Sequence, residues 1–231
     1  MKKTFLFAVI TVFASCIFTS CDNNEPKNKD NPKNDNEKTT LTLSGSLKYI
    51  EGTSDDYVIK DVTDQIDEIR VSVSYGEKHS KDTVFAKTTV SNGKFSITLP
   101  TPGDELLSLL FTGNESETII ISDKNAKGLF VYPSEEFDAY KNDEMISHVF
   151  RLSLKGSSQE SATSYIYSDR DFTMTGQHGS DETIFYKYNL SFKKGWNTFV
   201  LKGKKEGNTS VQEYSSENEP SNTMWLVNLN K

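Results

Sequence analysis

Aromatic side chains are the residues of this chain best suited to recognise a ligand. Tyr165 and Tyr167 stand two residues apart in a strand-like segment, so both side chains are expected on one face, and Trp196 follows a later turn. Exposed flat rings of this kind stack on the faces of sugars. We therefore predict a ligand-binding platform at these three residues, with burial in a core as the competing interpretation. Trp225 alternates in register with aliphatic residues and is expected in the core.

Acidic residues gather in short clusters, and pairs of carboxylates carry out catalysis in glycosidases. The clusters are Asp55 with Asp56, Asp61 with Asp64 and Asp67, and Glu135 with Glu136 and Asp138. We interpret all three as solvated loops. Asp169 and Asp171 could offer oxygens to Ca²⁺, but the spacing of a calcium-binding loop does not surround them. No metal site is assigned.

No other motif points to an enzyme. His79, His148 and His178 are far apart in sequence. The chain has no Gly-rich phosphate loop, no Gly-x-Ser-x-Gly elbow, no His-Glu-x-x-His and no cysteine pair spaced for zinc. We predict a protein without catalytic residues or cofactors.

Composition excludes one class of partner. The 231 residues include 26 Lys and Arg against 33 Asp and Glu, which gives a net charge of -7. Nucleic-acid binding needs a basic surface that neutralises phosphates, so no nucleic acid is expected as a partner. The length suits one large β domain or two small ones.

The N-terminus has the pattern of a secretory signal. Lys2 and Lys3 precede an apolar run over residues 5–18, which is shorter than the ~20 residues that span a bilayer. The sequence Phe18-Thr19-Ser20-Cys21 resembles the lipobox of bacterial lipoproteins. This resemblance implies a signal peptide over residues 1–20 and a diacylated Cys21 at the mature N-terminus. The alternatives are lipidation of Cys16, or an ordinary signal that is cleaved elsewhere or left as an anchor.

Residues 21–40 are expected to form a disordered tether. Residues 22–40 contain Asn, Lys, Asp, Glu, Pro and Thr but no apolar residue, so they cannot bury surface to offset the entropy of ordering. The acidic start of this segment resembles the signals that send Bacteroidota lipoproteins to the outer face of the outer membrane. It implies a lipid-anchored protein exposed at the cell surface.

From residue 41 onward, apolar residues alternate with polar ones, as in half-buried strands. The clearest signal is a hairpin over residues 84–99, in which Asn92 and Gly93 supply the positive φ angles of a tight turn. Short helices are expected within residues 101–111 and 134–142. Strands are predicted over residues 41–49, 69–75, 118–122, 128–132, 148–154, 164–168, 172–175, 184–192, 196–201, 209–214 and 224–229.

These strands predict an all-β fold. We expect β-sandwiches resembling immunoglobulin or transthyretin-like modules, with a first sandwich over residues 41–133 and a second β domain over residues 144–231. A single continuous sandwich is the alternative.

The lipobox, the Asn-rich tether, a strand over residues 93–100 and a turn over residues 193–197 together resemble uncharacterised β-rich surface lipoproteins of gut Bacteroidota. These motifs are structural, so the resemblance implies no catalytic residue. Asp82-Thr83-Val84 also resembles the sequence at which Bacteroidota O-glycosylate exported proteins, which implies glycosylation of Thr83.

The leading functional hypothesis is a non-catalytic binding module, anchored in the outer membrane through lipid on Cys21, with a glycan or a surface protein as its ligand. One alternative is a structural or assembly subunit of a surface complex. The other is a carboxylate-dependent glycan hydrolase.

Overall fold

The computed structural model describes residues 39–53, 56–75, 81–111, 118–155, 158–179 and 184–229. The predicted signal peptide, Cys21 and the tether as far as residue 38 lie outside the described residues. Within them the chain is almost entirely strand, so the predicted all-β class is confirmed. No helix among these residues is long and apolar enough to cross a membrane.

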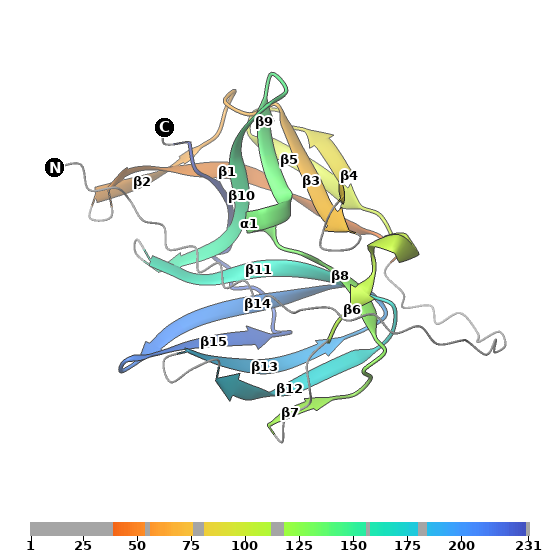
Figure 1. Cartoon of the computed structure of the whole chain (residues 1–231). Helices are drawn as coiled ribbons and strands as arrows, with labels where there is room; N and C mark the ends of the chain where they lie inside the picture. Colours follow the sequence, from red (N-terminus) through yellow and green to blue (C-terminus); the bar gives the residue numbers. More distant parts are fainter. Residues whose placement is uncertain are drawn as a thin grey trace.

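Sixteen strands form one large mixed sheet that is not closed (Figure 1). Its longest path runs β2-β1-β16-β10-β11-β14-β15-β13-β12-β7. The pairs β1 with β16 and β13 with β15 are parallel. The strands are β1 (Leu41–Thr53), β2 (Asp56–Asp61), β3 (Glu68–Tyr75), β4 (Lys81–Thr89), β5 (Lys94–Leu99), β6 (Ser108–Leu109), β7 (Ile119–Ile121), β8 (Lys127–Val131), β9 (Phe137–Lys141), β10 (Glu144–Lys155), β11 (Ser158–Ser168), β12 (Phe172–Gly179), β13 (Ile184–Phe192), β14 (Gly195–Glu206), β15 (Thr209–Ser215) and β16 (Met224–Val227).

The predicted turn between β4 and β5 is present, but the two strands are not ladder partners. Asn92 and Gly93 have φ angles of 48° and 68°. Beyond a single bridge at the turn, β5 pairs with β1 and β4 pairs with β3. The turn therefore connects β4, which pairs with β3, to β5, which pairs with β1. Gly93 is required there, because a Cβ would lie 2.0 Å from the carbonyl oxygen of Val62.

Both predicted helices are single turns. A 3-10 turn covers Asp104–Leu106, and α1 covers Pro133–Glu136. The expectation of a helix continuing to residue 142 is wrong. Phe137 and Ala139 alternate in β9 and are both 0% exposed, so burial of this alternating pair favours a strand.

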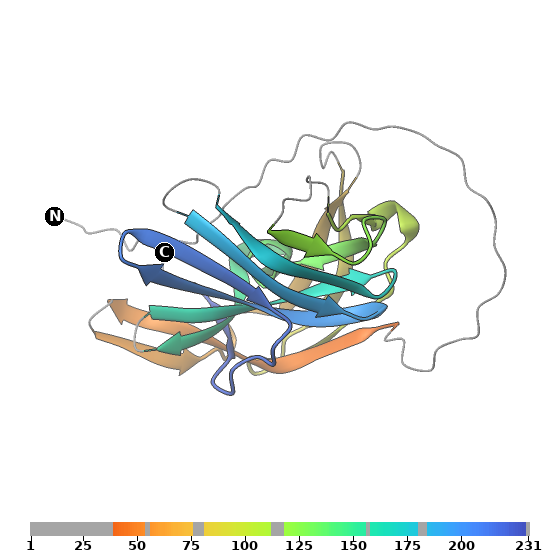
Figure 2. The same cartoon turned by 90° about the horizontal axis from the view of Figure 1, so that it is seen from below.

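Two apolar cores lie on opposite faces of β11. Residues 163–168 of this strand are all buried, and their side chains alternate between the two faces. Figure 1 shows β11 at the middle of the molecule, and Figure 2 shows β12 to β15 side by side in one layer. The first core includes Leu47, Ile69, Phe137, Tyr165 and Trp225. The second includes Ile119, Ile166, Phe172, Phe192 and Phe199.

Strands of the two predicted domains pair with each other. The parallel pair β1 and β16 joins Leu47 to Trp225, and β8 pairs with β11. The first core draws residues from both regions. The division into residues 41–133 and 144–231 stays a prediction.

Gly45 permits the close approach of β1 to Trp225. A Cβ on Gly45 would lie 2.6 Å from Cδ1 of the Trp225 ring. That ring is 2% exposed and is held edge-on by Phe95, with ring centroids 5.2 Å apart.

We predict that Gly45→Ala destabilises the fold. Because the added methyl group would overlap the Trp225 ring, the ring must shift from its contacts with Phe95 and Phe137, and this overpacking should cost about 1–3 kcal/mol of unfolding free energy. Chemical denaturation followed by tryptophan fluorescence measures this change. The control is Ser46→Ala, at the next, exposed position, which should unfold as the wild type does. Equal stability of both variants would contradict the proposed contact.

Candidate functional site

A cleft of about 660 Å³ opens on the Tyr165 face of the sheet, and we call it the polar cleft. The first half of β1 forms one wall, and residues 216–219, which follow β15, form another. Its volume is in the ~300–1,000 Å³ range of small-ligand sites. Its lining residues are Thr42, Leu43, Ser44, Arg151, Tyr165, Ser191, Lys193, Lys194, Trp196, Asn197, Thr198, Ser216, Glu217, Asn218, Glu219 and Trp225.

The structure brings two of the three predicted ligand residues to this cleft. Tyr165 and Trp196 line it, and Tyr167 does not. The expectation that all three rings are exposed together is wrong: Tyr165, Tyr167 and Trp196 are 3%, 6% and 2% exposed. Their common face is the one that packs into the first core. The rings therefore close the base of the cleft and present no stacking platform.

An ion pair that the sequence does not suggest crosses the cleft. Arg151 Nε and Nη2 donate to the two carboxylate oxygens of Glu219, at 3.2 and 2.5 Å. The Arg151 guanidinium also lies 5.0 Å from the centre of the Trp225 ring. Burial raises the pKa of Tyr165, whose ring stacks against Trp225, and the charge of Arg151 opposes this shift. The pair is thus held rigidly against aromatic surface.

The segment from Ser216 to Thr223 is fixed to the sheet at several points. Lys202 binds the carboxylate of Glu217 at 2.7 Å, and the Ser191 amide donates to Ser216 Oγ at 2.8 Å. Asn222 donates from its side chain to the carbonyl oxygen of Leu154 at 3.1 Å. This wall of the cleft is therefore preorganised.

The turn over residues 193–197 forms the opposite rim. Asn197 locks it, because its Oδ1 accepts from the Lys193 amide at 2.9 Å and its Nδ2 donates to the carbonyl oxygens of Lys193 and Gly195. Gly195 has a φ of 96°. Trp196 donates from Nε1 to the Pro100 carbonyl oxygen at 3.0 Å, which ties this turn to the end of β5.

Four lining side chains remain available to a ligand. Ser44, Ser191, Thr198 and Asn218 are exposed, and their side chains have no hydrogen-bond partner among the described residues. Three hydroxyls and one amide thus face the cleft beside the Arg151–Glu219 pair. Hydroxyls and amides both donate and accept, as recognition of a polyhydroxylated ligand requires.

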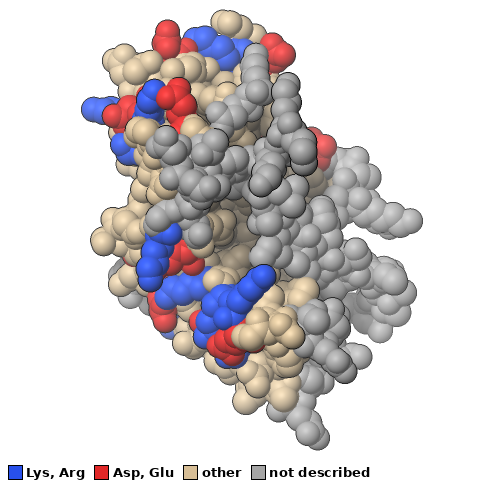
Figure 3. All heavy atoms as spheres, turned by 90° about the vertical axis from the view of Figure 1, so that its left-hand side faces the viewer, with Lys and Arg blue, Asp and Glu red and all other residues tan. Residues whose placement is uncertain are grey.

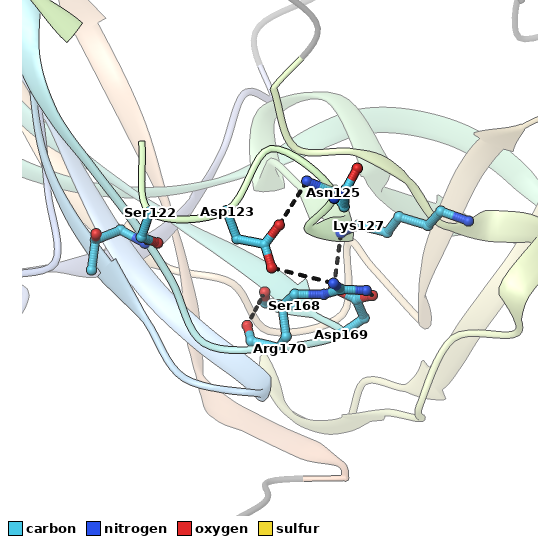
Figure 4. A network of polar contacts seen from close by, with 8 residues as sticks. Ser122, Asp123, Asn125, Lys127, Ser168, Asp169 and Arg170 are labelled. Carbon is cyan, nitrogen blue, oxygen red and sulfur yellow. Dashed lines mark hydrogen bonds and ion pairs between the residues drawn. The ribbon is translucent and has the colours of Figure 1, made fainter. Parts of the chain in front are cut away.

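Asp169 and Asp171 are occupied by protein partners. Asp169 accepts from the Lys127 amide at 2.9 Å and from Arg170, which also binds Asp123 (Figure 4). Asp171 binds Lys193 at 2.7 Å. Among the described residues, no group of three or more His, Cys, Asp or Glu could hold a metal ion. We interpret this network as a structural link between two turns.

In the cluster of Asp61, Asp64 and Asp67, two carboxylates contact lysine side chains. Asp61 binds Lys48 at 2.7 Å, and Asp67 lies 3.7 Å from Lys141. On the face shown in Figure 3, acidic and basic side chains are intermixed. Asp55 and the side chain of Asp56 lie outside the described residues.

Two of the three histidines have defined neighbours. His148 Nδ1 is 2.9 Å from Asp138, whose pKa is raised by burial. His178 stacks on Tyr186 and Tyr188, with ring centroids 5.1 and 5.7 Å apart. His79 lies outside the described residues. Thr83 is half-buried in β4, opposite Val73, and its glycosylation stays a prediction.

Glu136 is the carboxyl with the most perturbed titration. It ends α1, and its Oε2 accepts from the Tyr132 amide at 2.6 Å. Burial raises its pKa to about 8; the Tyr132 amide opposes this shift, and the charges of Glu135 and Asp138 add to it. Glu136 is therefore not the solvated loop residue that the sequence suggested.

We predict that Glu136→Gln removes a pH dependence of stability. Between its ordinary pKa of 4.5 and its folded pKa of about 8, this carboxyl is ionised in the unfolded chain and protonated in the folded one. Stability therefore falls with rising pH by on the order of 1 kcal/mol per pH unit, and the loss is complete above the folded pKa.

The glutamine keeps an acceptor for the Tyr132 amide but does not ionise. The variant should match the wild type near pH 4.5 and exceed its stability at pH 8, in denaturation measured across this range. Glu135→Gln, at an exposed neighbour, is the control and should follow the wild type. Parallel pH profiles for Glu136→Gln and the wild type would refute the assignment.

Comparison with known proteins places the chain in no group. No family profile matches it, and no curated protein or solved structure matches it significantly.

Proposed function

We propose that this protein is a non-catalytic binding module that takes an oligosaccharide in the polar cleft. The observation that supports the proposal most strongly is the set of unpaired hydroxyl and amide groups on Ser44, Ser191, Thr198 and Asn218, around a rigid Arg151–Glu219 pair. Oligosaccharides offer many hydroxyls to such groups and carry few charges, which suits a cleft of mixed charge.

Binding without catalysis is favoured by the state of the cleft carboxylates. Glu217 pairs with Lys202, which lowers its pKa, and Glu219 pairs with Arg151. A glycosidase needs one carboxyl whose pKa is raised enough to donate a proton. The ion pair with Lys202 lowers the pKa of Glu217. Glu217 and Glu219 are therefore better suited to orient a ligand than to cleave it.

The module is proposed to stand at the cell surface on a lipid anchor. Diacylation of Cys21 would hold it in the outer membrane, because each buried CH₂ contributes about 0.8 kcal/mol. The tether would separate the folded part from the lipid headgroups. The net charge of -7 does not favour adsorption to anionic membranes, so lipid is the expected means of attachment.

A protein ligand is the second candidate, and the edge of β1 favours it. Residues 41–46 pair with β5 on one side, and no strand among the described residues pairs with their other edge. Thr42, Leu43 and Ser44 line the cleft at this position. An extended peptide could add there as a further strand.

We predict that Thr198→Leu weakens glycan binding. The substitution removes a hydroxyl from the cleft and places an apolar side chain there, so affinity should fall by about tenfold or more, which is ~1.4 kcal/mol. A glycan array identifies ligands for the full chain, and calorimetry measures their affinities. Thr175→Leu is the matched control, because Thr175 is an exposed threonine on β12 outside the cleft.

The proposal fails if no glycan binds, or if both threonine variants bind equally well. Binding of peptides in place of glycans would support the second candidate, a peptide that adds as a strand at the edge of β1. Hydrolysis of a bound glycan would support the hydrolase alternative.

We predict that Cys21→Ala releases the protein from the membrane. Without the thiol no acyl chains can be attached, so a bacterial host that processes lipoproteins should place the variant in the soluble fraction. Cys16→Ala is the matched control and should remain in the outer membrane fraction. Release of the Cys16 variant alone would show that Cys16 is the lipidated residue. Retention of both variants would contradict a lipid anchor.

A further inference from the structure

A second hollow lies on the opposite face of the sheet from the polar cleft. We call it the apolar groove; its volume is about 460 Å³, and Phe150, Leu152, Leu201 and Leu226 form its floor. Strand pairing places these side chains together, because Phe150 is opposite Leu226 and Leu152 is opposite Ala162, which is itself opposite Leu201. The floor thus crosses four neighbouring strands.

One end of the apolar groove is polar. The pairing of β14 with β15 sets Gly203 opposite Gln212 and Lys205 opposite Ser210. Alternation puts Lys205 and Gly203 on the same face as Leu201. All of these residues line the groove, so its apolar floor ends beside an amide, a hydroxyl and an ammonium group.

Gln212 supplies a neutral hydrogen-bonding group at the polar end of the groove. It is 4% exposed, and its side-chain amide has no hydrogen-bond partner among the described residues. Its amide atoms are not among the fully buried side-chain atoms that lack a partner, so they keep access to the groove. A ligand with a hydrogen-bond acceptor at this end of the groove could accept a hydrogen bond from the amide.

Lys205 supplies a free positive charge at the same end. It is exposed and has no ion pair among the described residues. Its neighbour Lys204 instead binds Glu206 and Glu213, at 3.0 and 2.7 Å. The charge at the groove is therefore uncompensated, and it favours an anion over a cation or a neutral molecule.

Gly203 keeps the groove open between its two ends. A Cβ at this position would meet no atom within 4 Å, so the backbone borders empty space. A larger side chain should therefore fit without disturbing the strand, and it would fill the passage between Leu201 and Lys205.

We propose that the apolar groove binds a free fatty acid. Its hydrocarbon chain lies along the floor of Phe150, Leu152, Leu201 and Leu226. Its carboxylate accepts hydrogen bonds from Gln212 and forms an ion pair with Lys205. The volume is in the ~300–1,000 Å³ range of sites for small ligands. This site lies on the opposite face from the polar cleft, and Arg151 is the one lining residue that both hollows share.

The test is calorimetric titration of the full chain with sodium dodecanoate. Dodecan-1-ol and dodecyltrimethylammonium serve as neutral and cationic ligands of the same chain length. Gly203→Leu fills the groove, and Thr175→Leu is its control on an exposed strand position. Lys205→Met removes the charge, and Lys94→Met is its control at an exposed lysine of β5.

We expect saturable binding of dodecanoate that Gly203→Leu weakens by about tenfold or more and Lys205→Met by about fivefold, the latter corresponding to ~1 kcal/mol for an exposed charge pair. Both controls should bind as the wild type does. Thermal unfolding of each variant verifies that it is folded. The proposal is overturned if dodecanoate does not bind, if Gly203→Leu leaves its affinity unchanged in a folded protein, or if the alcohol or the cation binds as tightly.

Discussion

The backbone of β11 has no access to water from either face over residues 163–168, so every peptide group there needs a partner in the sheet. β14 pairs with all six of these residues on one side. On the other side β8 pairs with residues 165–168, and β10 pairs with the part of β11 before residue 163. Most of the other strands pair with one of these three neighbours, either directly or through a further strand.

The polar cleft and the apolar groove lie on opposite faces of this sheet and are lined by side chains of different polarity. Side chains alternate across β11, so Tyr165 faces the first core and the polar cleft, while Ala162 faces the apolar groove. One face carries polar residues that come mainly from turns and strand ends. The other exposes aliphatic side chains from the middle of strands. A single sheet thereby carries two hollows of unlike polarity on its two faces.

The positions of most strands follow from alternation alone, as β5 illustrates, with Phe95, Ile97 and Leu99 buried and the residues between them exposed. Alternation does not predict which strands pair, because the side chains of a strand alternate with a period of two whichever strand lies beside it. Tyr165 and Tyr167 do share a face, as expected. Alternation does not reveal which face meets solvent, and here neither face does, because the Tyr165 face packs into the first core and the Ile166 face into the second. The Arg151–Glu219 pair joins residues 68 positions apart, and no local pattern signals it.

The parallel pairing of β1 with β16 has a consequence for biosynthesis. Trp225, near the C-terminus, packs between Phe95, Phe137 and Tyr165, so the first core is incomplete until the last strand has been synthesised. Contacts between such distant segments form slowly, because the loop entropy is lost before the contact is gained. Every buried residue of the second core precedes β16 in the sequence, so the second core can form while β16 is still missing, and the first core cannot.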